Sequence, residues 1–176
     1  THRGKQLNLP YTDEGSINEG KALKSILHPV GIIEIWLASG APLNTALAAE
    51  VADGWLPMGY GIDGWKIHGT NLENGFDKRK DTAVPREDFQ LFTNLSVEIT
   101  EDIQAAINRR KPLTAMYVGG MGSEQNNYHR DSMARRGFPE AAQKIQDCWL
   151  SGDKDAAVNA VPDEYIDQSG HTVSYT

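Results

Sequence analysis

The sequence predicts an α/β protein whose parallel strands are joined by helices, and the stretch 33–57 is the main reason. It begins with an apolar run over 33–37, which is typical of a strand covered on both faces. A turn of small residues follows at 38–41, and then an Ala-rich segment in which Pro42 suits the first turn of a helix. Asp53–Gly54 closes the helix and Trp55–Leu56 begins a second strand, so the stretch is a βαβ unit.

The helix of this unit has large apolar residues at helical spacing, namely Leu43, Leu47 and Val51. Such a stripe is typical of the face that a helix turns toward its core. We therefore expect these three side chains to be buried.

The turn between the first strand and the helix is the best candidate for a binding site. It consists of Ala38, Ser39, Gly40 and Ala41, which present almost no side chain. In βαβ units, ligands bind at the turn that follows a strand. A phosphate or carbonyl group could reach the backbone N–H groups at the helix N-terminus there. Small residues also permit tight packing of strand on helix, so the pattern alone allows both interpretations.

Three other segments shape the predicted fold. Residues 4–28 read as a strand and turn excursion, with a half-exposed strand over 7–11. Residues 59–84 have glycines scattered among charges and predict a long loop, which in a compact domain is either functional or disordered. Residues 89–99 are rich in aromatic and β-branched side chains and predict a second core strand.

The last third of the chain is predicted to be helical. Thr100 is the expected N-cap of the first of these helices. Residues 113–118 are ambiguous between strand and helix by pattern alone. Further helices are expected over 124–136, 139–151 and 153–160.

Composition excludes several classes of function. The net charge of −7 argues against general nucleic-acid binding, which needs basic surfaces. No apolar run approaches the ~20 residues of a membrane span. Cys148 is the single cysteine, so no intrachain disulfide can form and a cytoplasmic location is expected. The five histidines show no ligand spacing, so no metal site is predicted.

Several motifs of this chain resemble the luciferase-like monooxygenase superfamily, and more narrowly its branch that uses the deazaflavin coenzyme F-420. The Ala-rich helix ends in the family-like sequence ADGWLP at 52–57. GKALK at 20–24 is similar to the family's Gly-Lys-Pro-Leu-Lys. YVGGMGSEQNNYHRD at 117–131 resembles the family's Gly-Gly-Met-Gly loop and is the most specific match. The resemblance covers most of residues 4–167.

The resemblance implies a (β/α)₈ TIM barrel, which typically has about 250 residues and at least roughly 200. This chain has 176. We therefore expect a single domain over 1–176 that is a partial barrel, lacking the early strands. The closing strand is also expected to be missing, because residues 169–176 do not resemble it. Such a chain would be a fragment or a degenerate copy.

The function implied by the resemblance is that of an oxidoreductase that transfers a hydride to or from a small organic substrate with coenzyme F-420. A luciferase-like monooxygenase using FMN is the close alternative. The family's proton-handling residues come from earlier strands, so no catalytic residue can be assigned here. The implied cofactor-binding residues are the small-residue turn and the loop after the second strand: Ala38, Ser39, Gly40, Ala41, Met58, Gly59 and Tyr60.

Trp65 lies in the predicted Gly-rich loop, where it could shield a substrate pocket or anchor the loop. A further hypothesis belongs to another class, a non-catalytic half-barrel. Open strand edges and apolar surface would make such a protein self-associate, for example as a homodimer.

Overall fold

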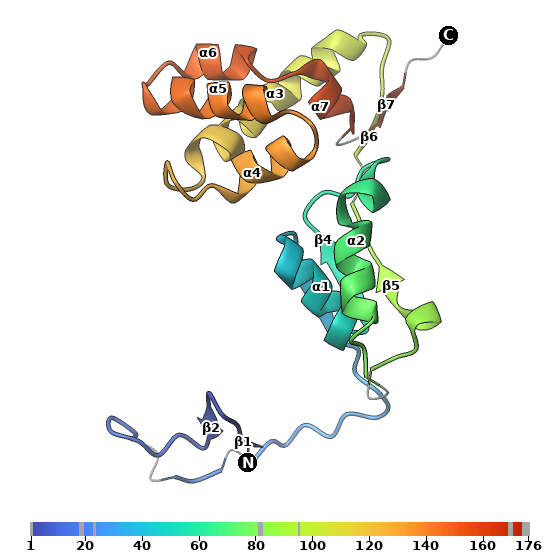
Figure 1. Ribbon diagram of the computed structural model, residues 1–176, viewed down its shortest axis with the longest axis vertical. Coiled ribbons are helices and arrows are strands. Elements are labelled where there is room, and N and C mark those ends of the chain that lie inside the picture. The colour runs from blue at the N-terminus through green and yellow to red at the C-terminus, as the bar shows by residue number, and fades with distance from the viewer. Residues whose placement is uncertain are drawn as a thin grey trace. The chain divides into compact units, whose positions relative to one another are not determined.

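Figure 1 shows the computed structural model of the chain, which describes residues 2–17, 20–22, 24–80, 83–94, 96–168 and 171–173. Contacts within the chain divide it into two compact units, Thr1–Ile33 and Glu34–Thr176. The parallel strands and all the described helices belong to the second unit.

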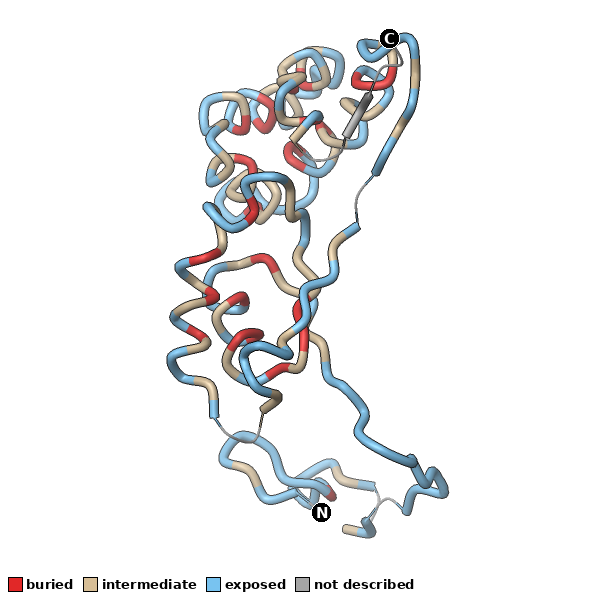
Figure 2. Tube along the Cα trace, turned by 90° about the vertical axis from the view of Figure 1, so that its right-hand side faces the viewer, coloured by how far each residue is buried: buried red, intermediate tan, exposed pale blue. Residues whose placement is uncertain are grey.

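The first unit contains a small antiparallel hairpin. Strand β1 (His2–Arg3) pairs with β2 (Asn8–Leu9). The predicted strand over 7–11 is thus present but shorter. Among the described residues of the segment 24–33 there is neither helix nor strand, and its side chains are exposed (Figure 2).

The second unit opens with three parallel strands connected by helices. In chain order the elements are β3 (Trp36–Ser39), α1 (Pro42–Val51), β4 (Gly54–Pro57), α2 (Gly64–Phe76), a 3-10 helix (Arg86–Asp88) and β5 (Gln90–Leu91). The sheet order is β3-β4-β5, and both neighbouring pairs are parallel. The predicted βαβ unit is confirmed, and a second one follows it.

Strand β3 starts at Trp36 rather than at Ile33. Among the described strands it pairs with β4 alone, so its beginning is uncovered and Ile33 and Ile35 are 69% and 64% exposed. Asp53 still aligns this end: its carboxylate accepts a hydrogen bond from the Ile35 N–H at 2.7 Å. The expectation of a strand covered on both faces is wrong here.

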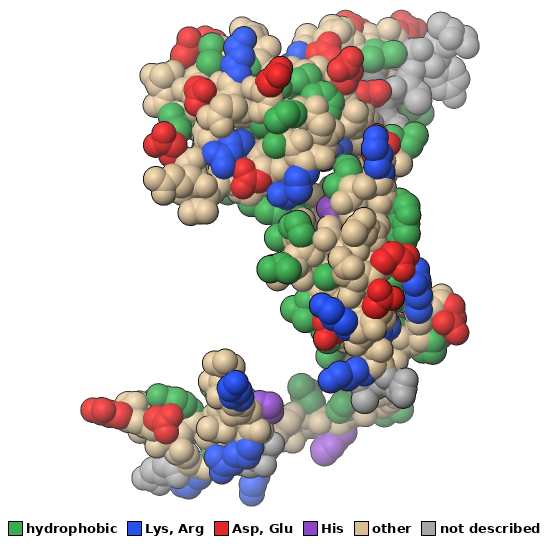
Figure 3. Space-filling model, in the orientation of Figure 1, with side chains coloured by type: hydrophobic (Ala, Val, Ile, Leu, Met, Phe, Trp, Pro, Cys, Tyr) green, Lys and Arg blue, Asp and Glu red, His purple; other side chains and the backbone are tan. Residues whose placement is uncertain are grey.

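Helix α1 buries the face opposite to the predicted one. The large apolar residues Leu43, Leu47 and Val51 are exposed, and Figure 3 shows apolar side chains over α1. Its buried side chains are the smaller Thr45, Ala48 and Ala49. Helix α2 comes so close that a Cβ on Gly75 would overlap the Ala46 carbonyl oxygen. Only small side chains fit at such a contact, so the leucines lie outside it.

Helix α2 occupies the middle of the segment predicted as a loop over 59–84, so that prediction is wrong for residues 64–76. The glycines here permit close packing instead of turns. A Cβ on Gly64 would lie 2.5 Å from the Tyr60 ring, and one on Gly69 would lie 2.9 Å from the Trp65 ring. Trp65 is therefore a helix residue and not a loop residue.

The single strand predicted over 89–99 is also wrong, because the segment contributes to two sheets. Strand β5 lies beside β4, whereas β6 (Val97–Ile99) pairs in parallel with β7 (His171–Val173). The pairing partner of a strand depends on the tertiary fold and not on its β-branched composition.

Helices α3 to α7 form their own apolar core (Figure 1). They are α3 (Ile103–Gly120), α4 (Tyr128–Arg135), α5 (Pro139–Leu150), α6 (Lys154–Asn159) and α7 (Asp163–Gln168). The largest apolar side chains in this core are Met133, Ile145 and Ile166, each at most 2% exposed. A separate core around Trp55 and Leu72 joins α1 and α2 to the sheet.

The three helices expected over 124–136, 139–151 and 153–160 are confirmed as α4, α5 and α6, and α7 was not predicted. Residues 113–118 are helical, since α3 continues through Pro112. Its N-cap is Asp102, whose carboxylate accepts a hydrogen bond from the Ala105 N–H at 2.9 Å. The predicted cap, Thr100, instead accepts a hydrogen bond from the Asp102 N–H.

Candidate functional site

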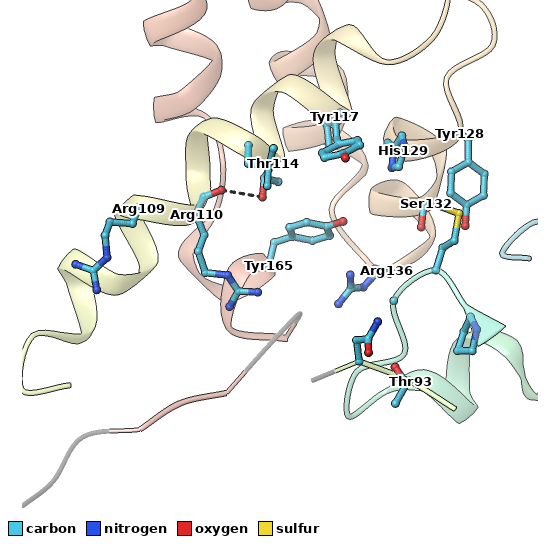
Figure 4. Close-up of a pocket in the computed structure, with 16 residues that line it drawn as sticks. Thr93, Arg109, Arg110, Thr114, Tyr117, Tyr128, His129, Ser132, Arg136 and Tyr165 are labelled. Carbon is cyan, nitrogen blue, oxygen red and sulfur yellow. Dashed lines mark hydrogen bonds between the residues drawn. The ribbon is translucent and has the colours of Figure 1, made fainter. Parts of the chain in front are cut away.

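A cleft of about 570 Å³ lies at the carboxyl ends of the parallel strands. Pro57–Gly59 at the end of β4, and Thr93 with Asn94 after β5, form what we call its strand-end side. Residues of α3, Arg136 and other residues of the α4 segment, and Tyr165 of α7 form its helix side (Figure 4). This volume is typical of small-molecule pockets, and α/β folds bind their ligands at this end of the strands.

The strand-end side exposes backbone. Gly59 has a φ of +87°, a left-handed conformation that favours glycine. A Cβ on Gly61 would overlap the Gln168 carbonyl oxygen. The loop after β4 therefore requires glycine at positions 59 and 61. At Gly59 the reason is the backbone conformation, and at Gly61 it is the close approach of Gln168 at the end of α7.

The small-residue turn adjoins the cleft. Gly40 is buried, and a Cβ there would overlap the hydroxyl of Tyr128 and lie 3.4 Å from the Cβ of Met58. Both neighbours line the cleft. The indole N–H of Trp55 donates to the carbonyl and hydroxyl oxygens of Ser39, at 3.1 and 3.0 Å, and holds the turn to the core.

The N-terminus of α1 at this turn is uncapped by any side chain. Ala41 is the N-cap residue, and Pro42 follows it. The first N–H groups of a helix have no acceptor within the helix. One turn later, the Thr45 hydroxyl is fully buried and makes no hydrogen bond within the described part of the chain. Unsatisfied polar groups of this kind suit an anionic group such as a phosphate.

The helix side is built from polar residues at helical spacing on two helices. Helix α3 contributes Arg110, Thr114 and Tyr117 among others, and the α4 segment contributes Tyr128, His129, Ser132 and Arg136. Residues three or four positions apart share a helix face, which explains why these side chains reach the same cleft. The Thr114 hydroxyl donates to the Arg110 carbonyl at 3.2 Å (Figure 4).

Three aromatic rings meet on this side. The ring of His129 lies 4.8 Å from that of Tyr117 and 5.3 Å from that of Tyr128. Burial lowers the pKa of His129, so its neutral form prevails at pH 7. A neutral imidazole offers one donor and one acceptor to a ligand.

Tyr165 and Arg136 form a pair. The Arg136 guanidinium carbon lies 4.7 Å from the centre of the Tyr165 ring. Burial raises the pKa of Tyr165, which the charge of Arg136 and its hydrogen bond to the hydroxyl partly offset. The phenol stays protonated at neutral pH and can donate a hydrogen bond.

The cleft is basic although the chain is acidic overall. Its lining includes Arg109, Arg110 and Arg136, and none of its described lining residues is Asp or Glu. Arg109 forms an ion pair with Glu98, and Figure 4 shows it pointing away from the other labelled side chains. A cleft lined by one sign of charge attracts ligands of the opposite sign.

The structure brings only part of the predicted cofactor set to the cleft. Met58 and Gly59 line it. Gly40 does not line the cleft, but it contacts Tyr128, which does. Ala38 and Ser39 are the last residues of β3 and Ala41 is the N-cap of α1, and none of the three lines the cleft. Tyr60 instead packs on Trp55 and stacks on His68. Trp65 is likewise outside the lining, and its role at the substrate stays a prediction.

The helix side of the cleft was missed by sequence reasoning. The available signal was the recurrence of polar and aromatic residues at helical spacing over 110–117 and 128–136. Nothing local indicates that these two faces meet each other and the strand ends.

Within the described ranges, no cluster of three or more His, Cys, Asp or Glu side chains could hold a metal ion. None of the described helices has the length and apolar character needed to cross a membrane.

The sequence profile of the luciferase-like monooxygenase family matches residues 9–172. The chain belongs to the luciferase-like monooxygenase family. The resemblance carried by the DGWLP and Gly-Gly-Met-Gly segments is thereby confirmed.

This luciferase-like chain is similar in sequence to a protein named for coenzyme F-420. It is 40% identical over 170 residues to a protein of Mycobacterium tuberculosis provisionally named a coenzyme F420-dependent oxidoreductase. The match covers 96% of this chain and 49% of the relative, so the chain spans about half the relative's length.

A solved structure supports the fold. The coenzyme F420-dependent tetrahydromethanopterin reductase of Methanopyrus kandleri superposes with a TM-score of 0.56 at 20% identity, over 81% of this chain and 38% of the reductase. At this identity the likeness concerns the fold alone. The luciferase-like chain is an α/β protein with part of a TIM barrel, as the sequence predicted.

Proposed function

We propose that this luciferase-like chain forms the coenzyme pocket of an F-420-dependent oxidoreductase, in which a hydride passes to or from a small organic substrate in the cytoplasm. The observation that carries the proposal is the cleft at the carboxyl ends of β4 and β5, with glycine backbone on one side and arginine and aromatic side chains on the other. The M. tuberculosis relative, named for the same coenzyme, supports this choice.

The residues present fit an anionic, planar coenzyme. The uncapped N-terminus of α1 and the buried hydroxyl of Thr45 suit a phosphate. Gly59, where a Cβ would have only the Arg136 guanidinium within 4 Å, leaves room for close approach of a ligand to the backbone. The rings of Tyr117, Tyr128 and His129 offer an apolar surface for a ring system. When bound, the deazaflavin supplies the hydride chemistry, and the protein supplies binding and orientation.

A coenzyme titration tests the proposal. The 176-residue chain is titrated with F-420 and, separately, with FMN, and binding is followed through the coenzyme's fluorescence anisotropy. We expect saturable F-420 binding. Thr45→Val, which removes the hydroxyl and keeps the shape, should weaken this binding roughly tenfold, as for a lost hydrogen bond to a charged group.

Thr70→Val is the matched control, because Thr70 is an exposed residue of α2. The F-420 assignment fails if the chain binds FMN and not F-420, a result that would favour the monooxygenase alternative. Equal affinity of the Thr45→Val variant and the unmodified chain would contradict the phosphate position at α1.

One observation favours the non-catalytic alternative, a half-barrel that self-associates. Leu43, Leu47 and Val51 form an exposed apolar stripe, and β3 is an edge strand among the described residues. Large exposed apolar surface marks an association site. Sedimentation velocity decides: a homodimer that binds neither coenzyme supports this alternative, whereas a coenzyme-binding protein opposes it.

A further inference from the structure

Helix α4 presents several residues to the cleft and has little apolar anchorage of its own. Tyr128, His129 and Ser132 line the cleft, and Figure 4 shows the rings of Tyr128 and His129 on this helix. The helix has only eight residues, of which Met133 alone is buried. Helices this short are unstable in isolation and depend on tertiary contacts. The positions of the two rings therefore depend on what else holds α4.

Arg130 supplies an attachment through its guanidinium group. Its Nη1 donates to the backbone carbonyl of Glu124, in the loop before α4, and to the Oε1 of Gln146 on α5, both at 2.7 Å. Its Nε and Nη2 donate to the Asp131 carboxylate at 2.9 and 2.7 Å. One planar group thus joins the loop, α4 and α5, as the fixed donor geometry of arginine allows. Arg130 itself does not line the cleft.

The contact between Arg130 and Gln146 is made in the interior. Gln146 is 1% exposed, and the side chain of Arg130 is 18% exposed. The Gln146 amide nitrogen also donates to the Ser123 carbonyl, in the same loop, at 3.5 Å. Loop residues 121–126 are exposed, so polar contacts rather than burial fix their path. Loss of the guanidinium would leave the Gln146 oxygen buried without its donor, which is unfavourable.

We propose that Arg130 is a positioning residue of the cleft: it fixes the first turn of α4 against α5 and the preceding loop, and thereby sets where Tyr128 and His129 lie. The affinity of the cleft for its ligand depends on this arrangement, because only molecules with correctly placed rings bind the ligand tightly. Only the identity of this ligand as the coenzyme rests on the proposed function.

The first measurement needs no coenzyme. In NMR spectra of the isotope-labelled 176-residue chain, nuclear Overhauser effects are recorded from the ring of His129 to the rings of Tyr117 and Tyr128, 4.8 and 5.3 Å away. Arg130→Gln should weaken or abolish these ring signals, whereas the signals of Trp55, in the separate core, should stay unchanged. A residue that only stabilised the fold would leave the ring contacts intact in every folded molecule.

The second measurement is the affinity for F-420, followed by fluorescence anisotropy. Arg130→Gln should weaken binding about tenfold, which corresponds to a correct ring arrangement in about a tenth of the molecules. Arg130→Lys keeps the charge but not the planar fork, so it should weaken binding severalfold. Lys144→Gln is the matched control, since it removes one positive charge from an exposed position of α5 and should change neither measurement.

If Arg130→Gln loses its helical circular dichroism, Arg130→Lys and Gln146→Met replace it. Gln146→Met keeps the length of the side chain and removes the acceptor, so it should also weaken the ring signals.

Unchanged ring signals in a folded Arg130 variant, or an equal loss in Lys144→Gln, overturn the positioning role. Unchanged F-420 affinity in a variant that has lost its ring signals also overturns it, because the rings would then not set the affinity. If the unmodified chain binds no F-420 while its ring signals depend on Arg130, the proposed function fails and the positioning of the rings stands.

Discussion

The hydroxyl of Tyr128 occupies the space that a Cβ on Gly40 would need. These residues are far apart in the chain, one at the end of β3 and the other at the start of α4. Their contact joins the strand ends to the helix side of the cleft, so the cleft depends on a glycine at position 40.

Gly40→Ala should therefore lower the free energy of unfolding by about 1–3 kcal/mol, the usual cost of overpacking. Tyr128→Ala in the same chain should recover much of that loss, because it removes the overlapping hydroxyl. Urea denaturation of both single variants and the double variant gives the coupling energy. Additive effects in this cycle would show that the contact does not form.

Asn127 follows the Gly-Gly-Met-Gly segment and directly precedes α4. Its side-chain amide donates to the buried carbonyl of Val118 at 2.7 Å, and its side-chain oxygen caps α4 by accepting from the Arg130 N–H at 3.0 Å. Asn127→Ala should cost about 2–4 kcal/mol, the sum of a lost cap and an unsatisfied buried carbonyl. Asn126→Ala, at an exposed neighbour, should change stability by less than about 0.5 kcal/mol in the same chemical denaturation assay.

Arg79 and Arg86 both place a guanidinium over a phenylalanine, yet they should differ in their effect on stability. Arg79 donates to the carbonyls of Ala49 and Ala52, at the C-terminal end of α1, at 2.5 and 2.8 Å, and to the carbonyl of Val84 at 2.7 Å. Charged donors are favourable at that end of a helix. Arg79→Gln should cost about 1.5–3 kcal/mol.

Arg86 instead pairs with Glu73 on the surface, where its side chain is 52% exposed. Arg86→Gln should change the free energy of unfolding little, as for other exposed ion pairs. Thermal and urea unfolding of the two variants would show the contrast, and comparable losses would count against the role assigned to Arg79.

His68 should make stability depend on pH. Burial lowers its pKa, and the charges of Arg135 and Arg136 lower it further. The unfolded chain then binds this proton more readily than the folded chain, so stability is present above the usual histidine pKa of about 6.5 and is lost as the pH falls below it. Burial acts in the same direction on the pKa of His129.

His68→Gln should therefore give a shallower decline in the free energy of unfolding between about pH 7 and pH 5, where histidine titrates. His28→Gln, at an exposed position, should keep the slope of the unmodified chain. A His68→Gln variant as sensitive to acid as the unmodified chain would show that other groups set the slope.

Local signals predicted the ends of α1 and α5. Pro42 and Pro139 mark the starts of α1 and α5 within a residue, and Gly152, with a φ of +90°, follows the end of α5. Prolines and glycines act through their own backbone restrictions, which the sequence carries directly. The same signals could not tell a loop glycine from the packing glycines of α2.

By itself the sequence determined a βαβ unit within 33–57, the small residues that join its first strand to its helix, and membership of the luciferase-like family. The structure shortens the predicted turn, because Ala38 and Ser39 belong to β3. Only the tertiary structure decided that α1 turns its small residues inward, that 89–99 divides between two sheets, and that Arg110, Arg136 and Tyr165 meet the strand ends. The physical reason is the separation in sequence between the residues that interact. Helix ends and turns depend on neighbouring residues, whereas burial, strand pairing and a shared cleft arise from contacts between residues distant in sequence.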